Sequence, residues 1–175
     1  MKQFDHESSI TEQALTDLFG QYPANTNLPH VLLKVVALNR LYSTNILSVH
    51  DVANHIYQHS QDVDSALAIG SLNVVDLIAK VTITTTGKVR ENYSFATKYC
   101  SWHNQTSYPI WDTRVYRYLR SLRRTSSEPF LGTKLYFWDE YSEFVQLMTA
   151  FRDRYKLNPL TFKQIDKFLY QHGGN

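Results

Sequence analysis

The residues best suited to chemistry are concentrated between Ser94 and Arg124. This segment contains Lys98, Trp102, His103, Asn104, Trp111 and Asp112. The sequence Pro-Ile-Trp-Asp at residues 109–112 places the Asp112 carboxylate at the expected start of a helix. A carboxylate at that position accepts backbone N–H bonds and is stabilised by the helix dipole. Considered alone, Asp112 is therefore expected to be a helix N-cap.

The helix expected after Asp112 separates apolar from basic side chains. Its apolar stripe consists of Val115, Tyr118, Leu119 and Leu122, and largely opposite lie Arg114, Arg117, Arg120 and Arg124. A helix with one apolar face and several arginines on the opposite face is suited to phosphate contacts. On a merely solvated face these charges would repel one another, because no acids are interleaved. The pattern favours a polyanionic partner.

A second basic site is expected earlier in the chain. Lys88 and Arg90 lie beside Gly87, which follows a β-branched stretch. Backbone N–H groups at a glycine turn, together with two basic side chains, could hold a second phosphate.

Two histidines are candidates for a metal site. His55 and His59 are one helical turn apart, but spacing places no Glu, Cys or third His nearby. We therefore expect no metal, and we expect both histidines on a solvated helix face. Cys100 is predicted to be buried. The chain has no glycine-rich phosphate loop, dinucleotide fingerprint or Gly-x-Ser-x-Gly motif, so we expect no cofactor.

Apolar periodicity predicts that helices position these residues. Helices are predicted over 10–20, 31–41, 62–69, 71–80, 89–103 and about 136–155. Two more are predicted to begin after the caps Ser48 and Asp112, and the last runs from a Thr161-x-x-Gln164 capping box to Gly173-Gly174. We interpret the β-branched stretch Val81–Thr86 as an extended turn, because one strand cannot form a sheet. The prediction is a single compact all-α domain over residues 1–175, with roughly eight or nine helices and a helix-hairpin-helix-like element.

The composition is typical of a globular protein. The 175 residues are 43% hydrophobic and 19% charged, which is enough to bury one core. The net charge of +2 does not by itself demand nucleic acid. With one cysteine and no membrane-length apolar run, we expect a soluble protein of the cytoplasm that has no membrane partner. The sequence indicates nothing about oligomeric state.

In this chain a Thr/Gly hairpin is followed by a helix, a loop, an Asp at the next helix start and a basic helix. This order of elements resembles the helix-hairpin-helix DNA glycosylases, and most closely their small 8-oxoguanine glycosylase branch. The similarity is most specific over Gly87 to Tyr118, and TFKQIDKFLYQHG at the end is similar to that branch's closing helix. The resemblance implies that Asp112 is the essential carboxylate, which stabilises positive charge on the sugar as the base leaves and assists the nucleophile.

The resemblance also implies a partner, duplex DNA with one base flipped out of the stack. Trp102, His103 and Trp111 could then form the pocket for that base, although the two tryptophans could equally fill the core. Residues Gly87, Lys88 and Arg90 and the arginines of the basic helix would contact the DNA backbone.

The sequence departs from the family pattern at two places. Counting back from Asp112 along the family's spacing reaches Ser94 and not the lysine that forms a Schiff base in bifunctional members. Lys98 lies one turn later on roughly the same face. Three roles are open to it: a displaced nucleophile, a phosphate contact or a cation that lines the pocket. The hairpin has Gly87 where the family usually has two glycines, so we expect the arginine helix to carry more of the DNA affinity.

Three functions are consistent with these patterns. The first is a base-excision DNA glycosylase of DNA repair, a hydrolase that cleaves the N-glycosidic bond of a damaged or modified base. The second is a catalytically inactive DNA-binding module, which Ser94 and the reduced hairpin favour. The third is an all-α protein-interaction or host-defence accessory domain, whose aromatic residues, 14% of the chain, meet another protein.

Overall fold

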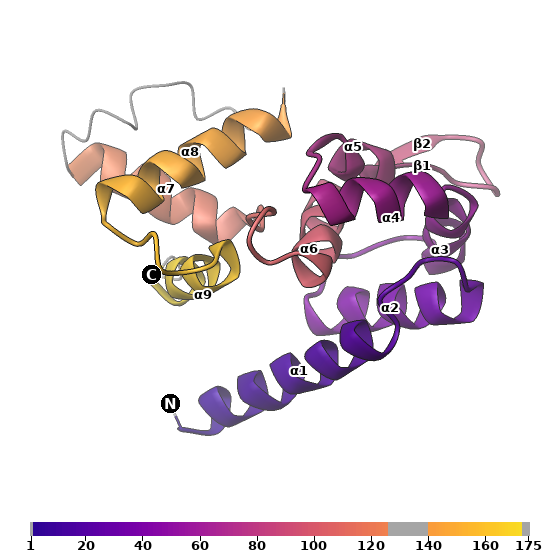
Figure 1. The fold of residues 1–175 in the computed structure, drawn as a ribbon, viewed down its shortest axis with the longest axis horizontal. Helices are drawn as coiled ribbons and strands as arrows, with labels where there is room; N and C mark the ends of the chain where they lie inside the picture. The colour runs from indigo at the N-terminus through magenta and orange to yellow at the C-terminus, as the bar shows by residue number, and fades with distance from the viewer. Residues whose placement is uncertain (1, 126–139, 173–175) are drawn as a thin grey trace. The chain divides into compact units, whose positions relative to one another are not determined.

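The computed structural model describes residues 2–125 and 140–172, which form helices joined by loops and one two-stranded hairpin (Figure 1). The predicted all-α class is confirmed. The chain divides into two compact units, Met1–His103 and Asn104–Asn175. The expected organisation as one domain over residues 1–175 stays a prediction.

The first unit surrounds a core of aliphatic and aromatic side chains. Its elements are α1 (Lys2–Gln21), α2 (Leu28–Leu41), α3 (Val49–Gln58), α4 (Ser60–Ile69), α5 (Asn73–Ala79), β1 (Lys80–Thr82), β2 (Val89–Glu91) and α6 (Tyr93–His103). Side chains without measurable exposure include Leu15, Val31, Val35, Leu38, Val52, Ile56, Val75, Ile78 and Tyr99. Their three- and four-residue spacing along α2 and α3 is the helical pattern expected of a buried face.

Local side chains fix several helix ends in this unit. The Asn27 side chain accepts a hydrogen bond from the backbone of His30 (3.1 Å), and Pro29 lies in the first turn of α2. Ser48 accepts from the backbone N–H of Asp51 (3.3 Å) at the start of α3. Gly70 ends α4 in the left-handed conformation, with φ of 71°. The helix boundaries predicted at Pro29, Ser48 and Gly70 are confirmed.

The hairpin between α5 and α6 corrects the predicted extended turn. β1 and β2 pair antiparallel, with Val81 opposite Arg90, so residues 89–91 form a strand where the periodicity predicted a helix. β2 has the sequence Val-Arg-Glu, and all of its side chains are exposed. Such a short segment lacks the apolar alternation that identifies a strand, and only its pairing with β1 defines it.

The second unit contains α7 (Thr113–Thr125), α8 (Tyr141–Arg154) and α9 (Phe162–His172). Its core includes Val115, Leu119, Phe144, Met148, Ile165 and Leu169. The predicted capping box is confirmed, because Thr161 Oγ1 accepts from Gln164 N (3.2 Å) and Gln164 Oε1 accepts from Thr161 N (2.8 Å). Together these bonds satisfy two backbone donors at the start of α9.

Some sequence predictions concern other parts of the chain. The predicted helix start near residue 136 and the terminal Gly173-Gly174 lie outside the described residues. Among the helices that the structure describes, none has the length and apolar character needed to cross a membrane.

Candidate functional site

The turn of the hairpin uses its backbone amides internally. Gly87 has a φ of 65°, which favours glycine, and its N–H donates to the carbonyl of Ile83 (2.8 Å). The Lys88 N–H lies 3.3 Å from the hydroxyl of Thr86, and the Lys88 carbonyl accepts from Ile83 (2.9 Å). The amides of Gly87 and Lys88 therefore have partners inside the turn. A phosphate here would be held by the exposed side chains of Lys88 and Arg90.

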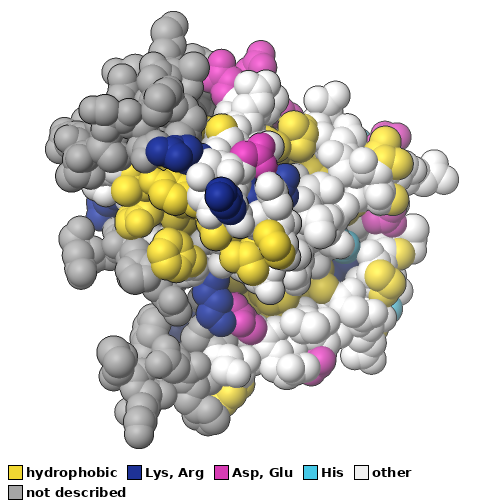
Figure 2. All heavy atoms as spheres, turned by 60° about the vertical axis from the view of Figure 1, so that its left-hand side comes forward, with side chains coloured by type: hydrophobic (Ala, Val, Ile, Leu, Met, Phe, Trp, Pro, Cys, Tyr) yellow, Lys and Arg dark blue, Asp and Glu magenta, His cyan; other side chains and the backbone are white. Residues whose placement is uncertain are grey.

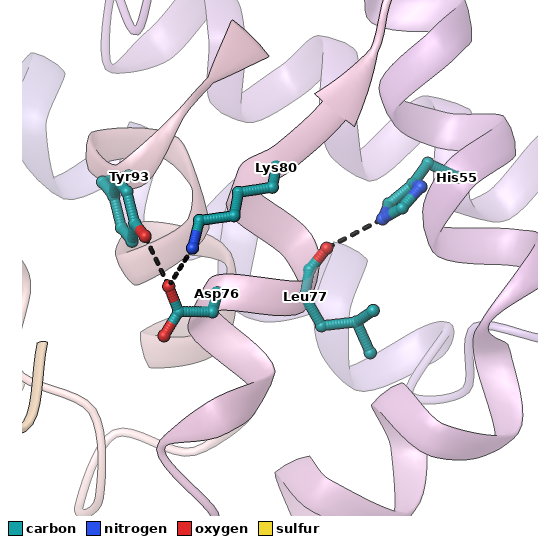
Figure 3. A network of polar contacts seen from close by, with 5 residues as sticks. All are labelled: His55, Asp76, Leu77, Lys80 and Tyr93. Carbon is teal, nitrogen blue, oxygen red and sulfur yellow. Dashed lines mark hydrogen bonds and ion pairs between the residues drawn. The ribbon is translucent and has the colours of Figure 1, made fainter. Parts of the chain in front are cut away.

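Polar contacts attach both the base and the turn of the hairpin to the rest of the first unit. Lys80 Nζ lies 3.2 Å from the Asp76 carboxylate, which also accepts from the hydroxyl of Tyr93 at the start of α6 (Figure 3). At the turn, the Asp51 carboxylate accepts from the Thr84 hydroxyl (2.5 Å) and the Thr84 N–H (3.2 Å). Hydrogen bonds, first from Thr84, lower the pKa of Asp51. The basic side chains of the hairpin thus project from an anchored loop.

Lys98 is buried in the first unit. Its side chain is only 2% exposed, and its Nζ lies 2.8 Å from the hydroxyl of Ser94, one turn earlier in α6. The ammonium also lies 5.7 Å from the centre of the Tyr42 ring, within the range of a cation–π contact. The amine of Lys98 therefore reaches back toward Ser94, the residue at which the sequence comparison with the glycosylases predicted a lysine.

Trp102 packs within the core of the first unit, and His103, which is partly exposed, contacts the same Phe19 ring. Trp102 is 5% exposed and stacks on Phe19, with ring centres 5.9 Å apart. His103 meets Phe19 edge-on at 5.0 Å, and its Nε2 lies 3.4 Å from the ammonium of Lys34. Burial, and then the charge of Lys34, lower the pKa of His103 to about 3. These contacts give Trp102 the core-filling role that the sequence left open.

The structure contains a buried lysine centre around Lys34 that the sequence patterns did not predict. The Lys34 side chain has no exposed surface, and its ammonium donates to the Tyr22 carbonyl (3.1 Å), the Ala24 carbonyl (3.2 Å) and Asn25 Oδ1 (2.7 Å). The same nitrogen lies 5.5 Å from the ring centre of Tyr99. Three acceptors in this arrangement match the three donors of an ammonium group.

Further hydrogen bonds orient Asn25, the side-chain acceptor of the lysine centre. Asn25 donates to Asp64 from its backbone N–H (3.0 Å) and from its side-chain amide (2.6 Å). The hydroxyl of Tyr99 donates to Asn25 Oδ1 (2.5 Å). Burial lowers the pKa of Lys34 to about 8, against the opposing effect of the Asp64 charge. Burial, followed by the Asp64 charge, also raises the pKa of Tyr99.

The sequence did contain one signal for this centre. Lys34 interrupts the apolar run of residues 31–41 and lies on the same helical stripe as Val31, Val35 and Leu38. A charged residue on a buried stripe requires paired partners, because an isolated buried charge is unstable. Its partners come from the loop after α1, and sequence spacing does not connect that loop to α2.

In the second unit, Asp112 lies at the start of α7 as predicted. Its Oδ1 accepts from the backbone N–H of Arg114 (2.9 Å), and its carbonyl accepts from Tyr116 N (3.0 Å). The side chain is partly exposed. The preceding turn is held in place because the Tyr141 hydroxyl donates to the carbonyl of Pro109 (2.7 Å). Asp112 is therefore a capping carboxylate on an anchored turn, with part of its surface accessible to solvent.

α7 has the two faces that its sequence predicts. Val115 and Leu119 are completely buried, whereas Arg114 and Arg117 are exposed. The guanidinium of Arg114 lies 4.4 Å from the ring centre of Tyr170 on α9. On the face of the second unit that Figure 2 brings forward, hydrophobic side chains adjoin those of Lys and Arg. The side chains of Arg120 and Arg124 lie outside the described part of the chain.

The predicted site residues are distributed over both compact units. Lys98, Trp102, His103 and the basic residues of the hairpin belong to Met1–His103, whereas Trp111, Asp112 and the arginines of α7 belong to Asn104–Asn175. Trp111 is partly exposed.

The two histidines of α3 have structural contacts. His55 Nε2 lies 2.8 Å from the carbonyl of Leu77 (Figure 3), and His59 Nδ1 lies 2.8 Å from the carbonyl of His55. Both rings are partly buried, which corrects their predicted place on a solvated face. Burial lowers the pKa of His55. Within residues 2–125 and 140–172, no group of three or more His, Cys, Asp or Glu side chains is arranged to hold a metal ion.

These features define an all-α protein with a buried lysine centre in one compact unit and an arginine-faced helix in the other. The chain belongs to the HI_0787_N family, whose model, described as an N-terminal domain, matches residues 1–107. It is 34% identical over 182 residues to an uncharacterized protein of Haemophilus influenzae (strain ATCC 51907 / DSM 11121 / KW20 / Rd), covering 97% of this chain and 85% of that protein. No solved structure matches the chain significantly. The family match begins and ends close to the limits of the first unit.

Proposed function

We propose that this protein binds DNA and is a base-excision glycosylase of the helix-hairpin-helix type. The observation that carries DNA binding is α7, where Arg114 and Arg117 are exposed opposite the buried Val115 and Leu119. The sequence of α7 contains no acidic residue, so no carboxylate on the same helix neutralises these charges. Phosphates are the partner that best satisfies such a face.

The support for base release is the carboxylate of Asp112 at the start of the same helix. One of its oxygens caps α7, and the side chain is partly exposed. As a base leaves, positive charge develops on the sugar, and a fixed carboxylate stabilises that charge without having to reorganise.

The compartment that we propose is the cytoplasm. Cys100, the chain's single cysteine, has a buried thiol, which fits a reducing compartment.

The test of DNA binding is to replace both exposed arginines, in the variant Arg114→Ala/Arg117→Ala. We expect affinity for a short duplex to fall, and the slope of log affinity against log salt to decrease by about two, since each lost phosphate contact removes about 0.9. Fluorescence anisotropy at several salt concentrations measures both quantities. The matched control is Arg40→Ala, which removes an exposed arginine from α2 in the first unit. An unchanged slope in the double variant would contradict binding through α7.

A second candidate function, a catalytically inactive DNA-binding module, is favoured by the environment of Lys98. Its amine is buried and hydrogen-bonded to Ser94, whereas Schiff-base chemistry needs an amine that can reach the sugar. Incubating the protein with duplexes that each contain one damaged base, with and without borohydride, separates the candidates. Release with a trapped adduct indicates a bifunctional enzyme, release alone indicates a glycosylase, and salt-sensitive binding without release indicates the inactive module.

A further inference from the structure

The second unit exposes aromatic rings that its core does not require. α9 already buries Phe162, Ile165 and Leu169, each at most 4% exposed, as its apolar face. Phe168 and Tyr170 on the same helix are 46% and 36% exposed. Aromatic side chains are enriched on surfaces where proteins bind other molecules, because one ring offers both apolar area and a π face.

The exposed rings of α9 adjoin the arginine face of α7. The Arg114 guanidinium lies 4.4 Å from the centre of the Tyr170 ring. Phe168 meets Tyr118 edge-on, with ring centres 6.5 Å apart and an angle of 86° between the rings. We call Arg114, Arg117, Tyr118, Phe168 and Tyr170 the aromatic–arginine surface. It combines partly exposed aromatic rings with positive charge inside one compact unit.

This combination distinguishes between two forms of DNA. An intact duplex presents phosphates outward but keeps the faces of its bases stacked inside. A single strand presents phosphates and base faces together, so aromatic side chains can stack on the bases while arginines contact the backbone. The positive charge of Arg114 and Arg117 complements that backbone. We propose that the aromatic–arginine surface binds single-stranded DNA in preference to intact duplex, an inference that rests on the proposed DNA binding.

The test compares the full-length protein with a fluorescein-labelled single strand of mixed sequence and with the corresponding duplex, by anisotropy at one salt concentration. We expect the single strand to bind about tenfold more tightly, because stacking on each ring contributes affinity that the duplex cannot gain. The variant Phe168→Leu/Tyr170→Leu removes both rings and is expected to lose this preference. Phe168→Tyr/Tyr170→Phe keeps the rings and is expected to retain it. Tyr57→Leu, which removes an exposed ring from α3, should leave the preference unchanged.

The outcomes separate this inference from the function on which it rests. Equal affinity of the wild-type protein for strand and duplex would overturn the inference and leave DNA binding intact, whatever the stability of the variants. Retention of the preference in the folded Leu/Leu variant would also overturn it. Binding of neither form would contradict both the inference and the proposed DNA binding.

Discussion

The variant Asp112→Asn is expected to lose base release while keeping its fold and its affinity for DNA. Asparagine caps a helix about as well as aspartate, so its Oδ1 can still accept the N–H of Arg114. The change removes the negative charge that would stabilise the developing positive charge on the sugar. Loss of one such electrostatic contact slows a reaction by about a hundredfold to a thousandfold.

The rate of base release is measured under single-turnover conditions, on a damaged duplex from which the wild-type protein releases the base. Anisotropy on the same duplex gives the affinity. Thermal unfolding of the variant checks the cap. Wild-type rates of base release in Asp112→Asn would exclude this carboxylate from the reaction.

The variant Lys34→Met is expected to lower the free energy of unfolding by about 1 to 3 kcal/mol, because two part-buried backbone acceptors would lose their charged donor. The carbonyls of Tyr22 and Ala24 would lose the contacts that Lys34 provides, whereas Asn25 Oδ1 would keep its bond from Tyr99. Urea unfolding measures the change. The matched control Arg40→Met removes an exposed charge from the same helix and should change stability by less than about 0.5 kcal/mol.

The stability difference between wild type and Lys34→Met should also depend on pH. Burial lowers the pKa of Lys34 in the folded protein from 10.5 to about 8. Between these values the unfolded chain binds more protons than the folded protein, so the free energy of unfolding of the wild type rises with pH. The variant lacks this titration, and the difference should widen as pH rises above about 8. A Met variant as stable as wild type at neutral pH would show that the lysine contacts contribute no net stability.

Local patterns predicted much of the fold. The caps at Ser48, Asp112 and Thr161 depend on residues two or three positions apart, so spacing alone could identify them. The stripe of Val115 and Leu119, which defines the arginine face of α7, is also a property of one helix. Such features follow from helical geometry, whatever the rest of the chain does.

Features that depend on contacts distant in sequence were not predicted. β2 is a strand because Arg90 pairs with Val81 across a turn, and its own sequence has no strand pattern. The Lys34 centre joins α2 to the loop after α1 and, through Asn25, to Asp64 on α4. The contact between Arg114 and Tyr170 joins helices separated by the whole of α8. In each case the partners come from separate elements, and periodicity describes only one element at a time.

The most direct test of DNA binding is the affinity of the purified wild-type protein for a short duplex as salt rises from about 50 to about 200 mM. The arrangement of Arg114 and Arg117 predicts a linear fall of log affinity with log salt, with a slope of about two or steeper. Affinity that does not change with salt, or no binding at the lowest salt concentration, would contradict DNA recognition by this protein.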